Sequence, residues 1–310
     1  MRYYFAPMEG LTDSTYRKLH HRFFPGIHRY YTPFFSPTQS HSLTGKEARE
    51  LVPRDKLDFT VIPQILTKVP EDFLWMAEKC KDLGYEEVNL NVGCPSGTVT
   101  AKGKGAGMLT DPDSLDRFLD AVFSKSPIAI SVKTRIGWED NAEFPRLLDT
   151  YNRYPIRELT LHPRVRKAFY AGEPDMEAFS YAVQNSQNPL CYNGEILSKT
   201  QAENVGNAFP QVQSVMIGRG LIAHPDMLCC QKADGQKLLE FYDALLEEYL
   251  ALFGGSRNAM FRLKEHWHYL LPCFQGSEKL GKRLRKTTDL LEYRAITREI
   301  FLSLHRQFTE

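Results

Sequence analysis

The stretch EVNLNVGCP, residues 87–95, contains a predicted β-strand over residues 87–92 that carries two asparagines and leads into Gly-Cys-Pro. Seven other short runs are rich in β-branched and aromatic residues, and amphipathic helical stretches separate them. The eight runs cover residues 3–7, 29–34, 59–66, 87–92, 128–134, 159–162, 190–193 and 212–217. Helical stretches are expected at residues 71–83, 113–124, 143–151 and 198–208, with Asp13, Asp113 and Ser198 as N-caps.

Eight strand–helix units in about 230 residues predict an α/β fold, a (β/α)8 TIM barrel spanning residues 1–237. A doubly wound open sheet is the rival, and a Gly-rich phosphate loop after the first strand would favour it. That strand instead ends in Pro7, Met8, Glu9 and Gly10, and the Gly-rich run 103–107 does not sit directly between a strand and a helix. A small helical domain is expected over residues 238–310, with helices at 238–253, 258–271 and 277–303.

Composition places the chain among globular proteins with a large core. It has 310 residues, 42% of them hydrophobic, and 37 aromatic residues. No apolar run approaches the roughly 20 residues needed to span a bilayer. The six cysteines include no Cys-x-x-Cys pair, so neither a zinc site nor a disulfide framework is indicated. We therefore expect a soluble, cytoplasmic monomer without a metal or a membrane partner.

Charge is unevenly distributed along the chain. Residues 256–310 hold eleven Lys and Arg against six Asp and Glu, whereas residues 1–255 hold 28 basic and 32 acidic residues. A basic appendage on a mildly acidic body favours a polyanionic partner, and a solvated helical surface is an equally good interpretation of this feature alone.

The predicted strand ends are unusually polar, and in a barrel the chemistry sits at the carboxyl ends of the strands. Singly, such residues can be caps or turn residues, but an unpaired buried lysine such as Lys133 is costly and favours an anionic partner. Together they suit a flat phosphorylated cofactor across the barrel mouth. The residues concerned are Gln64, Asn91, Lys133, Arg135, His162, Asn193, Glu195, Gly218 and Arg219.

Cys94 follows the fourth strand and precedes Pro95 and the Gly-rich run. A cysteine in a loop over a pocket is a candidate proton donor or nucleophile, although a lone cysteine is more often inert.

At these residues the chain resembles the tRNA-dihydrouridine synthases, which reduce uridine in RNA. The resemblance runs in order through residues 5–235, and a weaker one covers the helical tail, with Arg262 and Lys264. It is carried by the segments at 6–13, 63–65, 89–95, 103–109, 132–137, 162–164, 193–196 and 217–220.

The resemblance implies an FMN-dependent enzyme that takes electrons from NADPH and gives 5,6-dihydrouridine in tRNA. It implies a hydride passed from flavin N5 to uracil C6 and a proton passed from Cys94 to C5. Asn91 and Arg135 would lie near the uracil, and Arg164, Arg262 and Lys264 would contact RNA. The cofactor-binding residues would be Pro7, Met8, Gln64, Lys133, His162, Asn193, Glu195, Gly218 and Arg219.

The segment after His162 departs from the family pattern, because many members have Gly or Ala followed by Arg-Thr there. Here Arg164, Arg166 and Lys167 are candidates for contacts with a phosphate backbone, and a solvated charge run is the alternative. Three other functions stay open at this point: a synthase acting on ribosomal RNA, a non-catalytic RNA-binding flavoprotein, and a small-molecule flavin reductase.

Overall fold

The computed structural model describes residues 1–308, and its centre is one sheet of parallel strands. The strands are ordered β3-β2-β1-β9-β8-β7-β6-β5-β4, so each lies beside its neighbour in sequence except where β1 meets β9. Their bounds are β1 Arg2–Phe5, β2 Arg29–Tyr31, β3 Val61–Ile62, β4 Gln64–Ile65, β5 Glu87–Val92, β6 Ala129–Arg135, β7 Leu159–His162, β8 Leu190–Tyr192 and β9 Ser214–Ile217.

The two edge strands of this order, β3 and β4, are one strand interrupted at Pro63. Proline has no N–H to give to a neighbouring strand, so the ladder breaks there. β3 pairs with β2 and β4 pairs with β5, and Pro63 still accepts a hydrogen bond from Asn89 N at 2.8 Å. Chain continuity through Pro63 therefore closes the ring, and the predicted (β/α)8 barrel is confirmed.

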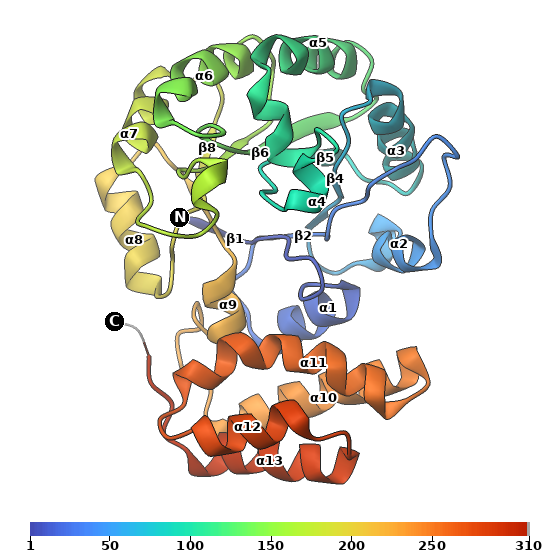
Figure 1. The fold of residues 1–310 in the computed structure, drawn as a ribbon, viewed down its shortest axis with the longest axis vertical. Helices are drawn as coiled ribbons and strands as arrows, with labels where there is room; N and C mark the ends of the chain where they lie inside the picture. The colour runs from blue at the N-terminus through green and yellow to red at the C-terminus, as the bar shows by residue number, and fades with distance from the viewer. Residues whose placement is uncertain (309–310) are drawn as a thin grey trace. The chain divides into compact units, whose positions relative to one another are not determined.

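Helices follow the strands and cover the outside of the ring (Figure 1). Their buried faces carry the apolar residues, such as Phe73, Met76 and Cys80 of α3. These helices are α2 Gly45–Glu50, α3 Pro70–Asp82, α5 Pro112–Phe123, α6 Phe144–Asn152, α7 Met176–Asn185 and α8 Lys199–Ala208. The one-turn helix α4 Gly97–Thr100, in the segment after β5, buries none of its residues. Short 3₁₀ turns lie at η1 Arg54–Lys56, η2 Gly105–Thr110, η3 Asn141–Glu143 and η4 Arg166–Ala168.

The N-cap predictions succeed at two of three helices. Asp13 accepts a hydrogen bond from Tyr16 N at 3.0 Å, and Ser198 accepts one from Gln201 N at 3.2 Å. Asp113 is not a cap. Asp111 caps α5 by accepting from Ser114 N, because Pro112 occupies the first helical position, where a missing N–H costs nothing.

By compactness the chain divides into two units, which are described separately. We call the first the barrel unit: residues Met1–Pro7, His28–Glu195 and Ala202–Ile217. The second, the helical unit, comprises Met8–Ile27, Ile196–Gln201 and the chain from Gly218 onward.

The helical unit is built from six helices and the turn η5 Leu271–Cys273. The helices are α1 Ser14–Phe23, α9 Arg219–Ala223, α10 Gly235–Phe253, α11 Ser256–Leu270, α12 Glu278–Lys286 and α13 Leu290–Ser303.

The helical unit does not begin at residue 238, because early segments of the chain pack into it. The ring of Tyr16, on α1, stacks on His266 at 4.9 Å and meets the edge of Phe241 at 5.7 Å. The roles expected for residues 1–237 and 238–310, catalysis and RNA binding, stay predictions.

The single helix predicted over residues 277–303 is wrong. It is two helices, α12 and α13, separated at Thr287–Asp289, where Asp289 caps α13 by accepting from Glu292 N at 2.7 Å. Within residues 1–308, no helix has the length and apolarity to cross a membrane.

Candidate active site

Amide side chains form a hydrogen-bonded row across the carboxyl ends of β4 and β5. Gln64 Nε2 donates to Asn89 Oδ1, and Asn91 Nδ2 donates to Gln64 Oε1, both at 2.8 Å. Asn89 and Asn91 are two residues apart on β5, so their side chains point to the same face. All three are buried, and their burial is sustained by these mutual bonds.

Asn91 also fixes the start of the loop that carries Cys94. Its Oδ1 accepts hydrogen bonds from the backbone N–H of Gly93 at 3.0 Å and of Cys94 at 2.9 Å. The Cys94 side chain is a free, half-buried thiol directly after β5. The Asn91 side chain therefore connects the amide row to the backbone of Cys94.

The Gly-rich run folds back onto Cys94. Ala106 N donates to the carbonyl of Cys94 at 3.0 Å. Gly105 has φ +57°, and a Cβ there would lie 3.0 Å from both the Cβ and the carbonyl oxygen of Cys94. Only glycine combines that φ with so close an approach, so the run packs tightly against the cysteine rather than standing off as a flexible loop.

Basic groups gather on the neighbouring strands β6 and β7. Lys133 lies opposite Asn91 in the ladder, and burial, with the charge of Arg135, lowers its pKa from 10.5 to about 8. Burial also lowers the pKa of Arg135 to about 10. Burial and then the charges of Arg135, Lys133 and Arg164 hold the pKa of His162 well below its usual 6.5, so His162 is neutral. The cluster suits a group that carries or develops negative charge.

Arg135 is held by the chain at two points. Its Nε donates to the carbonyl of Gly93 at 2.9 Å, and its Nη1 donates to that of Val165 at 3.1 Å. The Gly93 bond ties Arg135 to the loop of Cys94.

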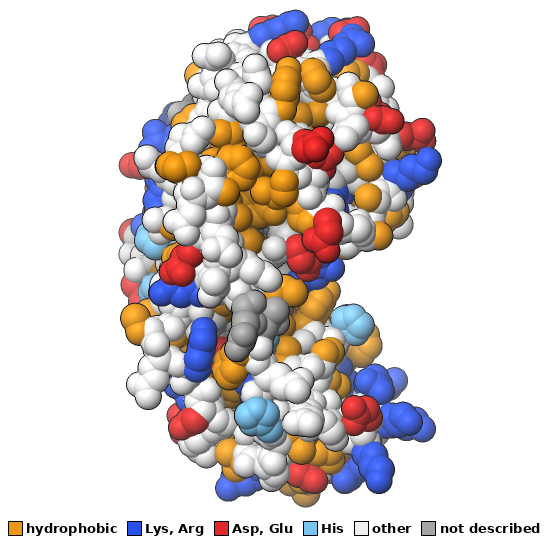
Figure 2. Space-filling model, turned by 90° about the vertical axis from the view of Figure 1, so that its left-hand side faces the viewer, with side chains coloured by type: hydrophobic (Ala, Val, Ile, Leu, Met, Phe, Trp, Pro, Cys, Tyr) orange, Lys and Arg blue, Asp and Glu red, His pale blue; other side chains and the backbone are white. Residues whose placement is uncertain are grey.

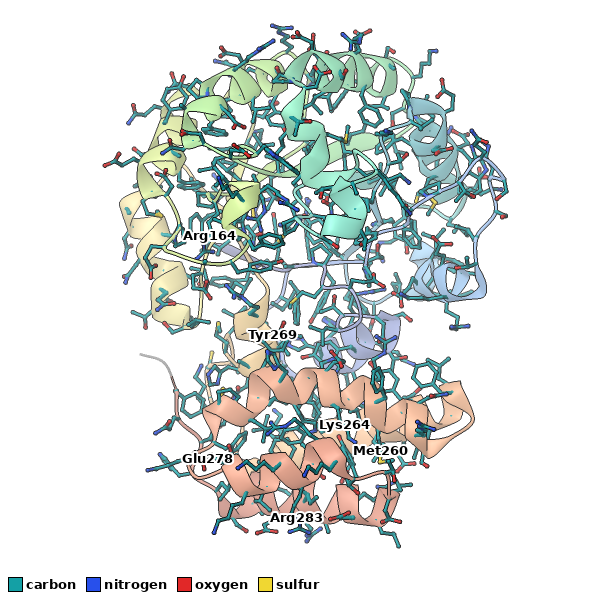
Figure 3. The ribbon with its side chains drawn as sticks, in the orientation of Figure 1. Arg164, Met260, Lys264, Tyr269, Glu278 and Arg283 are labelled. Carbon is teal, nitrogen blue, oxygen red and sulfur yellow. The ribbon has the colours of Figure 1, made fainter. Side chains whose placement is uncertain are left out.

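Arg164 is buried, with 4% of its surface exposed, and its bonds lie within the barrel unit. It donates to the carbonyl of Gly172 at 2.7 Å and forms an ion pair with Glu195 at 3.1 Å. Its Nη1 also lies 3.2 Å from His162 Nε2. These contacts favour a role for Arg164, which Figure 3 labels, in positioning His162 and Glu195. Its expected contact with RNA stays a prediction.

The ends of β7 and β8 bring two further expected residues together. Asn193 N donates to the carbonyl of Leu161, and Asn193 Nδ2 donates to that of Met216, at 2.9 and 2.8 Å. A Cβ on Gly194 would lie 2.0 Å from the hydroxyl of Tyr192, so glycine is required between Asn193 and Glu195. Pro7 ends the first segment of the barrel unit.

The remaining cofactor residues of the expected set, Met8, Gly218 and Arg219, belong to the helical unit. Met8 N donates to Thr12 Oγ1 at 2.9 Å. Gly218 follows β9 in the chain, and Arg219 begins α9. Their assignment to the cofactor stays a prediction.

The two cations expected to bind RNA in the helical unit have protein partners. Arg262 donates to the carbonyl of Gly10 at 2.5 Å and lies 3.7 Å from Asp13. Lys264, on α11, donates to the carbonyls of Thr287 at 2.5 Å and Arg285 at 3.3 Å, at the end of α12 (Figure 3). Both side chains hold the unit together, and their contact with RNA stays a prediction.

Other cations of the helical unit are exposed, and Lys and Arg side chains stand out from its surface (Figure 2). The sequence reasoning counted them in the charge of the tail but did not single them out. On α12 they are Lys279, Lys282, Arg283, Arg285 and Lys286.

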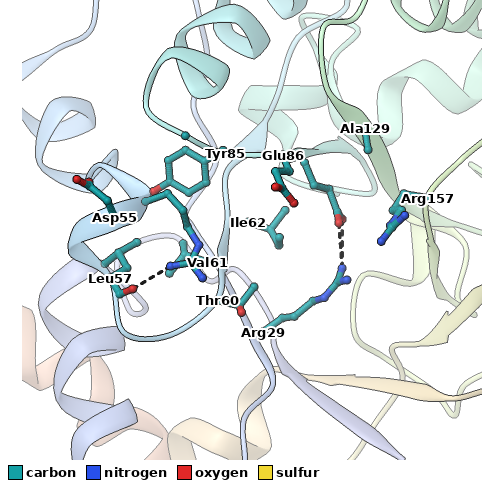
Figure 4. Close-up of a pocket in the computed structure, with 13 residues that line it drawn as sticks. Arg29, Asp55, Leu57, Thr60, Val61, Ile62, Tyr85, Glu86, Ala129 and Arg157 are labelled. Carbon is teal, nitrogen blue, oxygen red and sulfur yellow. Dashed lines mark hydrogen bonds and ion pairs between the residues drawn. The ribbon is translucent and has the colours of Figure 1, made fainter.

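A cavity of about 610 Å³ lies at the opposite end of the barrel, by the amino ends of the strands (Figure 4). Its Arg29 pairs with Glu87 at 3.1 Å, and its Arg54 donates to the carbonyl of Leu57 at 2.8 Å. The amino end of a barrel usually serves stability, and these charges are balanced, so we place the chemistry at the carboxyl end. Among residues 1–308, no group of three or more His, Cys, Asp or Glu is placed to hold a metal ion.

Comparison with known proteins identifies the family of the chain. A family model described as dihydrouridine synthase (Dus) matches residues 4–297. A probable tRNA-dihydrouridine synthase of Rhizobium leguminosarum is 26% identical over 287 residues, which cover 89% of this chain and 88% of that protein. A tRNA-dihydrouridine(16) synthase of Escherichia coli is 29% identical over 303 residues, which cover 92% and 93%.

Among solved structures, a morphinone reductase mutant in complex with tetrahydroNAD has a TM-score of 0.52 at 11% identity, covering 73% of this chain and 85% of that chain. This likeness concerns the barrel fold alone. The family model, by contrast, matches nearly the whole chain, motifs and helical tail included. The chain belongs to the dihydrouridine synthase family.

Proposed function

We propose that this enzyme reduces uridine to 5,6-dihydrouridine in tRNA, with FMN as its cofactor and NADPH as the reductant. The observation that carries the proposal lies at the end of β5, where the Asn91 side chain holds the backbone of Cys94 near the half-buried Lys133 and the buried Arg135 of β6. The family and the printed names of the relatives supply the substrate class.

The residues at the carboxyl end fit the cofactor. A flavin ring needs hydrogen-bond partners along its polar edge and gains negative charge on reduction, and Gln64 and Lys133 supply a neutral amide and a cation there. His162, Asn193 and Glu195 would line the same end, with Pro7 and Met8 beside the ring. Gly218 and Arg219, which follow β9 in the chain, would hold the phosphate.

Bound FMN, reduced by NADPH, would supply the hydride that goes from N5 to C6 of the uracil. Negative charge then develops at C5 and on O4 of the base. Cys94 gives the proton of its thiol to C5, so that uridine gains one hydride and one proton. A positioned general acid typically contributes 10²–10⁴-fold to the rate.

Asn91 and Arg135 would stabilise the charge that develops on O4. Both are held in place before substrate arrives, Asn91 by Gln64 and Arg135 by the carbonyls of Gly93 and Val165. Donors that are fixed in this way need no reorganisation during the reaction. The half-buried cluster also requires that the target uridine leave its stack, which favours an unpaired loop of the RNA.

The proposal is tested by mapping dihydrouridine in total RNA from a deletion strain and from the same strain carrying wild-type or Cys94→Ala enzyme. We expect loss at defined tRNA positions, restored by the wild type and not by the variant. The mapping also tests whether position 16, named for the Escherichia coli relative, is the target.

Loss confined to ribosomal RNA would retain the chemistry and replace the substrate. Full restoration by Cys94→Ala would remove the proposed acid. Turnover of free uracil by the purified enzyme without RNA would favour a small-molecule reductase instead.

A further inference from the structure

Two aromatic rings and one guanidinium are stacked on the loops that follow β6 and β7. The guanidinium carbon of Arg166 lies 4.5 Å from the ring centre of Trp138 and 4.9 Å from that of Phe169. We call Trp138, Arg166 and Phe169 the stacked triad. Cation–π contacts of this length are attractive, so the three planar groups support one another.

The backbone holds the triad in place. Arg166 N donates to the carbonyl of Gly137 at 2.8 Å, and Lys167 N donates to that of Trp138 at 3.0 Å. Arg166 Nη2 also donates at 3.3 Å to Oγ1 of Thr100, the last residue of the short helix α4 that follows Cys94. The triad therefore joins the segments that follow β5, β6 and β7.

Phe169 is strained and exposed at the same time. Its φ of +51° and ψ of −98° are rare for a residue with a side chain, and 42% of its surface is exposed. Such a conformation persists only where its surroundings enforce it, and it is enriched at functional sites. Burial of the ring in a core does not account for it, because much of the ring faces solvent.

The neighbouring residue connects the triad to the candidate active site. The ring of Tyr170 lies 5.5 Å from the guanidinium carbon of Arg135 and 6.1 Å from the ring of His162. Phe169 is therefore next in sequence to a residue that contacts Arg135, which we propose lies near the uracil.

We propose that the exposed face of Phe169 stacks on the base next to the target uridine, with Arg166 and Trp138 holding it in position. This inference rests on the proposed function. It adds Phe169 as a site that recognises the base beside the target uridine. A uridine that leaves its stack exposes the neighbouring base, and stacking of that base on an aromatic face recovers part of the cost. Unpaired RNA bases commonly stack on aromatic rings and on the guanidinium planes of Arg side chains.

The test replaces Phe169 in the full-length holoenzyme. Phe169→Gly removes the ring and accepts the positive φ, so the loop keeps its backbone. Loss of one base–aromatic stack should raise KM for tRNA about tenfold, with kcat at saturating tRNA changed less than twofold. Phe169→Trp keeps a stacking face and should stay within threefold of wild type.

The matched control is Tyr181→Ala, since Tyr181 is exposed to a similar degree, 38%, and lies on α7. It should leave KM unchanged. The salt dependence of tRNA binding should be the same for Phe169→Gly and wild type, because stacking releases no counterions. An unchanged KM in Phe169→Gly, or a loss of kcat with KM unaltered, would overturn the inference.

A binding assay separates failure of this inference from failure of the proposed function. A single-stranded RNA with 2-aminopurine next to a uridine is titrated with enzyme, and stacking quenches its fluorescence. Quenching that weakens in Phe169→Gly supports the stack even if wild type forms no dihydrouridine. Equal quenching by both proteins contradicts the stack even if wild type is active.

Discussion

The two ends of the barrel differ in how their basic side chains are paired. At the amino end, Arg29 pairs with Glu87 at 3.1 Å, and Arg2 lies 3.7 Å from Glu158. At the carboxyl end, burial and then the charge of Arg135 lower the pKa of Lys133, and burial and the charge of Arg164 lower the pKa of Arg135. The fold neutralises the cations at one end. At the other end Arg164 pairs with Glu195, whereas Arg135 is held by backbone carbonyls rather than by a carboxylate.

The difference separates residues that stabilise the fold from residues that act on a ligand. A cation with a carboxylate partner contributes to folding, whereas crowded cations cost folding energy and are retained for another reason. Substitutions at the two ends should therefore move different observables. Three substitutions test that expectation, and a fourth extends it to the helical unit.

Cys94→Ala should have the largest effect, a loss of 10²- to 10⁴-fold in the rate of dihydrouridine formation. The thiol is half-buried and its removal leaves a small space, so the free energy of unfolding should stay within about 1 kcal/mol of wild type. Single-turnover kinetics with pre-reduced enzyme measure the chemical step. The exposed Cys230→Ala is the control and should be silent. A rate within fivefold of wild type would assign the proton to another group.

Glu87→Gln should have the next largest effect, on stability rather than on activity. It leaves the half-buried guanidinium of Arg29 without its carboxylate, which should lower the free energy of unfolding by about 3 kcal/mol. Glu86→Gln is the matched control, since Glu86 is the exposed neighbour on the same cavity. Urea unfolding measures both variants. Loss of catalysis in Glu87→Gln that is still folded at low temperature would contradict the expectation that the amino end affects stability alone.

Sequence patterns could predict the strand ends because strand alternation and barrel topology are local and general rules. Eight β-rich runs place Gln64, Asn91, Lys133 and His162 at one end before any contact is known. The prediction of one unbroken strand over residues 59–66 misses the break between β3 and β4, although Pro63, which cannot donate to a ladder, signals that break.

Long-range partners could not be predicted in this way. Nothing near Arg164 signals that it turns inward to Gly172 and Glu195, nor that Lys264 caps a helix more than twenty residues away. The positive φ of Phe169 could not be predicted either, because residues with a side chain rarely adopt it. The break between α12 and α13 did leave a signal, because Asp289 and Glu292 have the spacing of a capping motif.

Lys133→Met should stabilise the protein while it reduces activity. The folded pKa of Lys133, about 8, is below its ordinary 10.5, so the unfolded chain binds more protons between these values. Unfolding free energy of the cofactor-free protein should therefore rise with pH from about 8 to 10.5, and this rise should be smaller in Lys133→Met.

At pH 7 the charged lysine costs the wild type stability, so the variant should be more stable by about 2 kcal/mol after allowance for partial exposure. The measurement is urea unfolding of both proteins at several pH values, with Lys125→Met as a surface control. Equal pH profiles for wild type and Lys133→Met would mean that the lysine already has an anionic partner in the fold.

Lys264→Met extends the same criterion to the helical unit and should have the smallest effect. Lys264 donates to two carbonyls at the end of α12, so its loss should cost about 1 kcal/mol of stability and leave the salt dependence of tRNA binding unchanged. Lys282→Met, on the exposed face of α12, should do the reverse, since a phosphate contact contributes about one unit to the salt slope. Lys264→Met could instead reduce the salt dependence of tRNA binding and leave the free energy of unfolding unchanged. A cation with a protein partner would then not be structural in the helical unit, and the distinction between paired and unpaired cations would hold only within the barrel.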